Sequence, residues 1–280
     1  MATIRTRDVR RFGRDLRDVA RATDAATTAA YLGEVVRTLP AIARSRSLVP
    51  ADERMAGRIW PFQVACTQVP VQVPVDGTMF AGAREMYARR VYFPPIAPAL
   101  TIPRGGNVVD LGANHGLFTC LAAHVAARVV AVEAQSGFVA AVAAAARASG
   151  GRAQVTVEHA LIGAGSGLVA DPDWVTVASD YQTPPPVIGL TDLLDRHALR
   201  TVDFMKIDIE GSEFDLFDEG LDWLPRTHRI AMEVHTEFGD PGRLRTLLEE
   251  SGFETVMADN ELRPTNVVTA ESGYLYAWRR

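Results

Sequence analysis

The sequence predicts an α/β fold in which a mostly parallel sheet carries helices on both faces. Short β-branched runs alternate with helical stretches from residue 107 to the C-terminus, which is typical of successive βαβ units. A glycine-containing loop follows the first of these runs, at the position where open α/β sheets bind ligands. The chain has 280 residues, 48% of them hydrophobic, so it is long enough for one such domain and an additional element.

The segment 107–133 has the pattern strand, glycine loop, helix, strand. Its first apolar run ends at Asp110, and Gly112 and Gly116 then allow the backbone to turn tightly beside a ligand. The second run carries no charge until Glu133, as expected of a parallel strand covered on both faces. Glu133 would lie at the tip of that strand, where a carboxylate can accept hydrogen bonds from a ribose diol.

The spacing of the loop residues narrows the choice of nucleoside ligand. A dinucleotide site needs Gly-x-Gly-x-x-Gly, whereas the loop here is Gly112-Ala-Asn-His-Gly116, one glycine short. Asp110 and Asn114 suit a ligand with an amino acid group and a sulfonium, which is S-adenosylmethionine. An NAD-dependent oxidoreductase is therefore the less favoured alternative.

Two motifs carry a resemblance to a known family. The runs Asp110–Phe118 and Lys206–Glu213, together with Glu133, resemble the FkbM-type family of S-adenosylmethionine-dependent methyltransferases, and Glu85–Tyr92 is similar to the element that precedes the first core strand there. The resemblance covers about residue 85 to the C-terminus.

The resemblance implies a class I methyltransferase (Rossmann-like) sheet with an antiparallel C-terminal hairpin. It also implies O-methylation of a hydroxyl on a small molecule, such as a natural product or a sugar. The cofactor-binding residues expected on this basis are Glu85, Tyr92, Asp110, Gly112, Ala113, Asn114, Gly116, Phe118, Glu133, Ala134, Ala160 and Asp208.

Titratable side chains are expected to converge beside this loop. On the fourth strand, a period of two places Lys206, Asp208 and Glu210 on one face, and Glu233 and His235 share a face of the fifth. These five residues are the candidate catalytic set. His235 is the candidate general base because an unperturbed imidazole titrates near working pH, although a histidine that caps a strand end is an equal alternative.

Lys206 is the only lysine in the chain, which has 28 arginines. A compact ammonium is therefore suited to this position, either to neutralise Asp208 and Glu210 or to act directly on substrate. Asp208 and Glu233 also resemble the carboxylate pair that holds magnesium in catechol-type methyltransferases, although a nearby Lys206 opposes a second cation. Binding of magnesium by Asp208 and Glu233 therefore stays an alternative.

Residues 1–60 are predicted to form an N-terminal helical cap, because apolar residues recur at spacings of three and four between residues 8 and 45, with Pro40 and Pro50 as interruptions. A lid or a dimer element is the alternative. Residues 61–100 form a substrate-side hairpin and a connecting segment, since residues 62–80 alternate polar and apolar positions. Residues 101–280 form the S-adenosylmethionine-binding domain.

The remaining elements follow from the same patterns. A helix at 137–149 ends at Gly150-Gly151, and the loop 163–190 is expected to contribute to acceptor recognition together with residues 60–100. The other predicted elements are strand 155–162, helix 191–197, strand 202–209, helix 216–224, strand 230–234, helix 244–250 and a hairpin of 253–258 with 273–278.

The net charge of −5 is unevenly distributed. Residues 1–58 contain 12 Arg and 7 acidic residues, an excess of five positive charges, so the remainder carries −10. An acidic domain argues against a nucleic-acid partner. The two cysteines, Cys66 and Cys120, are expected as free thiols in a strand and a helix.

No apolar run approaches the about 18 residues of a membrane span, so we expect no membrane contact and a cytoplasmic location. The expected partner is a hydroxylated small-molecule acceptor, and a homodimer is possible. The alternative from a different class is a non-catalytic protein that keeps the fold and binds another protein through helices 8–45.

Overall fold

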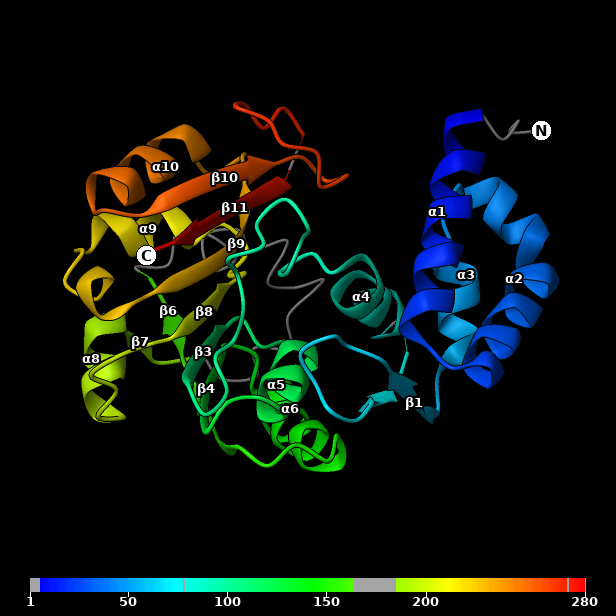
Figure 1. Cartoon of the computed structure of the whole chain (residues 1–280), viewed down its shortest axis with the longest axis horizontal. Helices are drawn as coiled ribbons and strands as arrows, with labels where there is room; N and C mark the ends of the chain where they lie inside the picture. The colour runs from blue at the N-terminus through cyan, green and yellow to red at the C-terminus, as the bar shows by residue number, and fades with distance from the viewer. Residues whose placement is uncertain (1–5, 78, 164–184, 271, 280) are drawn as a thin grey trace.

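A seven-stranded sheet organises the fold (Figure 1). The computed structural model describes residues 6–77, 79–163, 185–270 and 272–279. The strand order is β10-β11-β9-β8-β3-β4-β5, in which β11 runs antiparallel to both of its neighbours and the pairs among β9, β8, β3, β4 and β5 are parallel. The predicted fold class is thereby confirmed. The strands are β3 (Asn107–Leu111), β4 (Arg128–Glu133), β5 (Gln154–His159), β8 (Phe204–Ile207), β9 (Arg229–His235), β10 (Glu254–Ala258) and β11 (Ser272–Trp278).

Helices cover both faces of the sheet because neighbouring strand residues point to opposite sides. Val108 packs in one apolar cluster with α5 (Leu117–Ala123), and Val109 packs in a second cluster on the other face. That second face is covered by α8 (Leu190–Arg196), α9 (Glu213–Asp218) and α10 (Pro241–Glu250). On the first face α6 (Ser136–Ala148) lies beside α5 and ends before Gly150, which has a positive φ.

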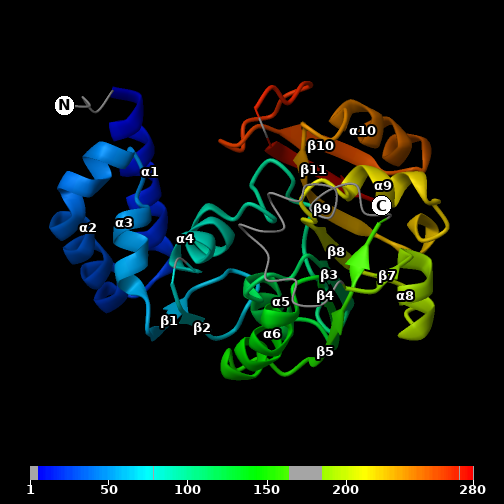
Figure 2. The same ribbon diagram turned by 180° about the vertical axis from the view of Figure 1, so that it is seen from behind.

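The N-terminal helices lie at one end of the molecule, with α4 and a hairpin between them and the sheet, as Figures 1 and 2 both show. The hairpin pairs β1 (Arg58–Phe62) with β2 (Val71–Val75). The other elements of this part are α1 (Thr6–Ala22), α2 (Ala25–Ser45), α3 (Val49–Asp52), η1 (Glu53–Met55), α4 (Met79–Ala83) and a π-helical turn, η2 (Arg84–Arg89).

A buried ionic cluster ties these helices together. The Arg84 guanidinium lies 3.0 Å from the Asp52 carboxylate and 3.5 Å from that of Asp15. The Tyr31 hydroxyl donates to Asp52 at 2.7 Å. Because α1, α2, α3 and η2 each supply one of these residues, the N-terminal helices pack as one unit against the segment that leads into the core.

The expected interruption at Pro40 was wrong, because Pro40 lies inside α2, which continues to Ser45. The apolar residues of α2 divide between two sides: Val35 is buried, whereas Leu32, Val36 and Leu39 are exposed. Cys66 lies in the turn between β1 and β2, not in a strand, and both cysteines are free.

Several predicted element boundaries also change. The third strand ends at His159, and β6 (Leu161–Ile162) pairs instead with β7 (Val187–Ile188) in a separate sheet. The helix predicted at 216–224 is replaced by α9 and a short 3₁₀ helix, η3 (Leu224–Arg226), because Gly220 has φ 137° and interrupts it. Most of the loop 163–190 lies outside the described residues. Among the described helices, none is long and apolar enough to cross a bilayer.

Candidate active site

The glycine loop after β3 is packed against the end of β8. Gly112 has φ 74°, and a Cβ at this position would overlap the main-chain carbonyl oxygen of Asp208. The N–H groups of Gly112 and Ala113 donate to Val132 O at 3.0 and 2.9 Å, which fixes the loop to β4 as well. Gly116 has φ 78° and would place a Cβ 3.1 Å from the Cα of Val142 on α6. Both glycines are therefore required by close backbone approach.

Two adjoining cavities open at the carboxyl ends of the strands. They share Gly112, Asn114, His115 and Asp208. The smaller cavity measures about 200 Å³ and lies at the tips of β4 and β5, where Glu133, Phe138 and Ala160 line it. The larger one measures about 510 Å³ and reaches toward α4, η2 and β11. Its lining includes Met79, Glu85, Tyr92, Phe118, Lys206, Glu233 and Tyr274.

Glu133 ends β4 as predicted and is 4% exposed. Its Oε2 accepts the Asn114 N–H at 2.6 Å and its Oε1 accepts the Gln135 N–H at 2.7 Å. Burial raises the pKa of this carboxyl and the two N–H groups lower it, with a net rise above its usual value. Each carboxylate oxygen keeps a further lone pair, so hydroxyl donors in the smaller cavity can still bind.

Asp110 and Lys206 lie beneath the loop as a buried ion pair. Asp110 is fully buried, accepts the Thr119 hydroxyl at 2.6 Å, and lies 3.4 Å from Lys206 Nζ. Lys206 donates to the carbonyl oxygens of Leu111, at 3.1 Å, and Gly112. Burial opposes the ammonium charge, but the carboxylates of Asp110 and Asp208 outweigh it and raise the pKa of Lys206. Lys206 therefore stabilises the glycine loop through hydrogen bonds to its carbonyl oxygens.

Asp208 lies where the two cavities meet. The Tyr92 hydroxyl donates to its Oδ2 at 2.8 Å, and Lys206 Nζ lies 3.6 Å from the same oxygen. The ring of Tyr92 packs edge-on against Phe118 and Tyr274. The segment that follows η2 thus helps, together with β11, to position a carboxylate that follows β8.

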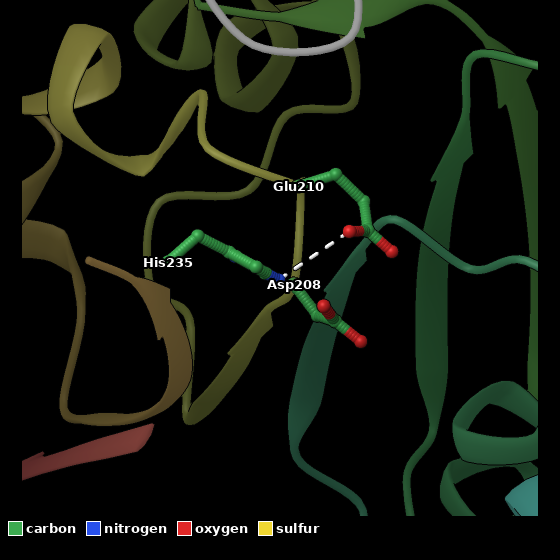
Figure 3. A group of neighbouring side chains, drawn as sticks. All are labelled: Asp208, Glu210 and His235. Carbon is green, nitrogen blue, oxygen red and sulfur yellow. Dashed lines mark ion pairs between the residues drawn. The ribbon is translucent and has the colours of Figure 1, made fainter. Parts of the chain in front are cut away.

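His235, at the end of β9, lies between the carboxylates of Glu213 and Glu210. Figure 3 draws its contact with Glu210. Its Nδ1 lies 3.1 Å from Glu213 Oε1, and its Nε2 lies 3.3 Å from Glu210 Oε2. Burial lowers the pKa of His235, but the hydrogen bond to Glu213 and the charges of Glu213, Glu210 and Asp208 raise it to about 9. A protonated imidazole cannot accept a proton, so this geometry disfavours the expected role of general base.

Glu233 lines the larger cavity. Ser272 Oγ donates to its Oε1 at 3.0 Å. Burial and the repulsion of Asp208 raise the pKa of this carboxyl to about 8, against the smaller opposing effect of His235. Glu210 lines the smaller cavity, and burial and Asp208 raise its pKa to about 6.

The family model described as "Methyltransferase FkbM domain" matches residues 110–255, which is more than half of the chain. The chain belongs to the FkbM methyltransferase family. The expected resemblance is confirmed, and membership implies the use of S-adenosylmethionine. It also sets aside the NAD-dependent alternative.

No curated protein matches the sequence. Solved structures similar to this FkbM-family chain share little sequence identity with it. An uncharacterized protein from Listeria monocytogenes serotype 4b has 14% identity and a TM-score of 0.41, with 65% of each chain covered. The chain therefore spans slightly less than two thirds of the length of that protein. The 23S rRNA methyltransferase ErmE has 17% identity, a TM-score of 0.40, and coverage of 69% of this chain and 68% of its own. Precorrin-6y C5,15-methyltransferase from Geobacter metallireducens GS-15 has 14% identity, a TM-score of 0.39, and coverage of 64% and 84%.

The structure brings most of the predicted residues to the two cavities of this FkbM-family site. Ten of the twelve predicted cofactor-binding residues line a cavity, whereas Asp110, which lies beneath the loop, and Gly116, which ends it, line neither of the two. Lys206, Asp208 and Glu233 line the larger cavity, Glu210 lines the smaller, and His235 lines neither. The ten predicted cofactor-binding residues that line a cavity are Glu85, Tyr92, Gly112, Ala113, Asn114, Phe118, Glu133, Ala134, Ala160 and Asp208.

Four of the side chains that sequence reasoning missed are polar or aromatic. His115 and Phe138, whose ring centroids lie 4.4 Å apart, line the smaller cavity beside Gln135. Tyr274 reaches the larger cavity from β11, directly opposite Glu233 in the strand register. The position of His115 inside the glycine loop was a signal that could have identified it.

Proposed function

We propose that this FkbM-family protein methylates a hydroxyl group of a small molecule, with S-adenosylmethionine as the methyl donor. The observation that supports it most is the larger cavity of about 510 Å³, which adjoins the cavity beside Glu133. This volume is in the range of small-molecule sites. Its charged lining is three carboxylates, Glu85, Asp208 and Glu233, and one ammonium, Lys206, which is occupied by the loop.

The smaller cavity fits the nucleoside part of the cofactor. Glu133 is the acceptor for the ribose hydroxyls, and His115 and Phe138 offer ring surfaces for a base. An acidic site opposes phosphate-rich acceptors, which supports a small molecule over a nucleic acid.

Methyl transfer forms a carbon–oxygen bond and breaks the bond between the methyl carbon and the cofactor's sulfonium. The products are a methyl ether, S-adenosylhomocysteine and the proton of the acceptor hydroxyl. The protein must hold the acceptor oxygen in line with the methyl group and accept that proton.

Glu233 is the side chain we assign to accept the proton. It lines the larger cavity, and its raised pKa, about 8, is close to working pH, where a general base is most effective. His235, by contrast, directs both ring nitrogens at carboxylates and lines neither cavity.

The test measures cofactor binding and transfer separately. We expect isothermal titration of the full chain with S-adenosylhomocysteine to show binding. Incubation with methyl-labelled S-adenosylmethionine and a panel of glycosides and phenols should give a labelled methyl ether, identified by mass spectrometry. Total RNA and casein serve as competing acceptor classes in the same assay.

Glu233→Gln should bind S-adenosylhomocysteine as the wild type does and lose about 10²–10⁴-fold in turnover. Glu219→Gln is the matched control, because this exposed carboxylate lies outside both cavities. Label found only on RNA, on protein, or on nitrogen would overturn the proposal. Full turnover by Glu233→Gln would overturn the assignment of Glu233 as the general base.

A further inference from the structure

Three side chains at the ends of β8 and β9 bring oxygen and nitrogen donors together (Figure 3). One carboxylate oxygen each from Asp208 and Glu210 and a ring nitrogen of His235 lie within 4.8 Å of one another. All three residues are half-buried, so they are accessible without being fully hydrated. The group differs from the metal-binding pair expected from the sequence, Asp208 and Glu233, because it does not include Glu233.

A buried carboxylate behind His235 determines which ring nitrogen faces the group. Glu213 is fully buried, and its two oxygens accept the N–H groups of Ile209, at 3.1 Å, and Gly211, at 2.9 Å. Its Oε1 also contacts His235 Nδ1 at 3.1 Å. Since a carboxylate so occupied can only accept, Nδ1 carries a hydrogen whether the ring is neutral or protonated. Nε2, which is turned toward Glu210, is then the nitrogen that a cation would bind on displacing its proton.

A histidine oriented in this way by a carboxylate is the arrangement that metal sites use. Metal-binding imidazoles donate their other N–H to a carboxylate or carbonyl, which fixes the tautomer and increases the basicity of the ligating nitrogen. Glu213, which is not one of the three donors, supplies that contact here. The contact fixes the ring of His235 with Nε2 on the side of Glu210.

The backbone around the donors is held in place by specific contacts. Glu210 has φ 53°, in the left-handed region, and Gly211 follows with φ 99°, where a Cβ would collide with the ring of Phe238. This turn directs the Glu210 carboxylate back toward His235. Strained non-glycine backbone of this kind persists where the surroundings fix it, often at functional sites.

The ammonium of the neighbouring Lys206 does not compete with a cation for these three donors. Lys206 Nζ is engaged by the carbonyl oxygens of Leu111 and Gly112 and by Asp110. Its contact with Asp208 is to Oδ2, the same oxygen that accepts Tyr92, so Oδ1 is left for another partner.

We propose that Asp208, Glu210 and His235 form a divalent cation site, with Glu213 as the positioning residue for His235. Two carboxylates and one imidazole suit a first-row cation such as Mn²⁺ better than Mg²⁺ or Ca²⁺, which prefer oxygen ligands alone. Three protein ligands leave coordination positions open toward the cavities that Asp208 and Glu210 line.

The experiment is a titration of the full chain, freed of metal with EDTA and dialysed, with MnCl₂. Free Mn²⁺ is followed by electron paramagnetic resonance, without cofactor or acceptor, so the outcome does not depend on the proposed function. We expect one saturable Mn²⁺ per chain and weaker competition by MgCl₂. Glu210→Gln and His235→Gln should weaken Mn²⁺ binding by at least about tenfold, and Glu213→Gln by about 10–100-fold.

Glu219→Gln and His228→Gln are the matched controls, since both residues are exposed and His228 precedes the opposite end of β9. They should bind Mn²⁺ as the wild type does. Circular dichroism melts confirm that each variant is folded, and Glu210→Gln is the least disturbing because 41% of its side chain is exposed. Absence of saturable Mn²⁺ binding by the wild type, or unchanged binding by folded Glu210→Gln and His235→Gln, would overturn the proposal.

Discussion

The main-chain carbonyl oxygen of Asp208 occupies the space that a side chain at Gly112 would require. The loop after β3 and the end of β8 are therefore in backbone contact. This contact places Asp208 at the junction of the two cavities, and it brings Lys206 under the carbonyl oxygens of the loop.

Gly112→Ala should destabilise the protein and impair cofactor binding. A non-glycine residue at φ 74° costs about 1–3 kcal/mol, and the overlap with Asp208 adds to this unless the loop moves. Urea unfolding and titration with S-adenosylhomocysteine measure the two effects. Gly33→Ala in α2 is the control: its Cβ would meet nothing within 4 Å, and alanine should stabilise the helix by up to about 1 kcal/mol. Wild-type behaviour of Gly112→Ala would contradict the steric argument.

Lys206→Met should lower the free energy of unfolding by about 3–5 kcal/mol, because it leaves Asp110 buried without its cation. The double variant Lys206→Met/Asp110→Asn should recover part of that loss, since the remaining amide is neutral. Urea unfolding of the two single variants and the double variant gives the coupling. Strict additivity of the two single effects would show that the pair does not interact.

The order of strands and helices could be predicted because each core strand is a short β-branched run bounded by turn residues, as at Val108 and Val129. Glu133 could be predicted for the same reason, since it is the first charge after such a run. The side-chain alternation of β8 could be followed only to Asp208, because Glu210 has φ 53° and leaves the strand geometry.

The partners of the site residues could not be predicted, because they depend on distant contacts. Glu213, the first residue of α9, accepts from the preceding turn and also contacts His235, which lies 22 positions further along the chain. Tyr274 faces Glu233 only through the register of β11 with β9. Neither relation leaves a local pattern in the sequence.

Arg84→Met tests whether the N-terminal helices are an integral part of the fold. The substitution leaves Asp52, which is fully buried, without its guanidinium, and we expect a loss of about 3–5 kcal/mol in unfolding free energy. Arg37→Met is the control, because its ion pair with Glu34 is on the surface and is worth at most about 1 kcal/mol. Fluorescence and circular dichroism should report one unfolding transition. Two separate transitions would instead mean that residues 1–60 unfold on their own.

The affinity for S-adenosylhomocysteine should fall as the pH is lowered from about 8 to about 5. Ribose hydroxyls donate to the charged form of Glu133, and burial raises the pKa of this carboxyl, so protonation begins at a higher pH than for an exposed glutamate. Falling pH thus removes the acceptor. Glu133→Gln should bind about 1–3 kcal/mol more weakly at neutral pH and should lose this part of the pH dependence. Glu210 and Glu233 also titrate in the cavities, so the difference between the wild-type and Glu133→Gln titrations isolates Glu133. Two parallel curves would mean that Glu133 does not hold the ribose.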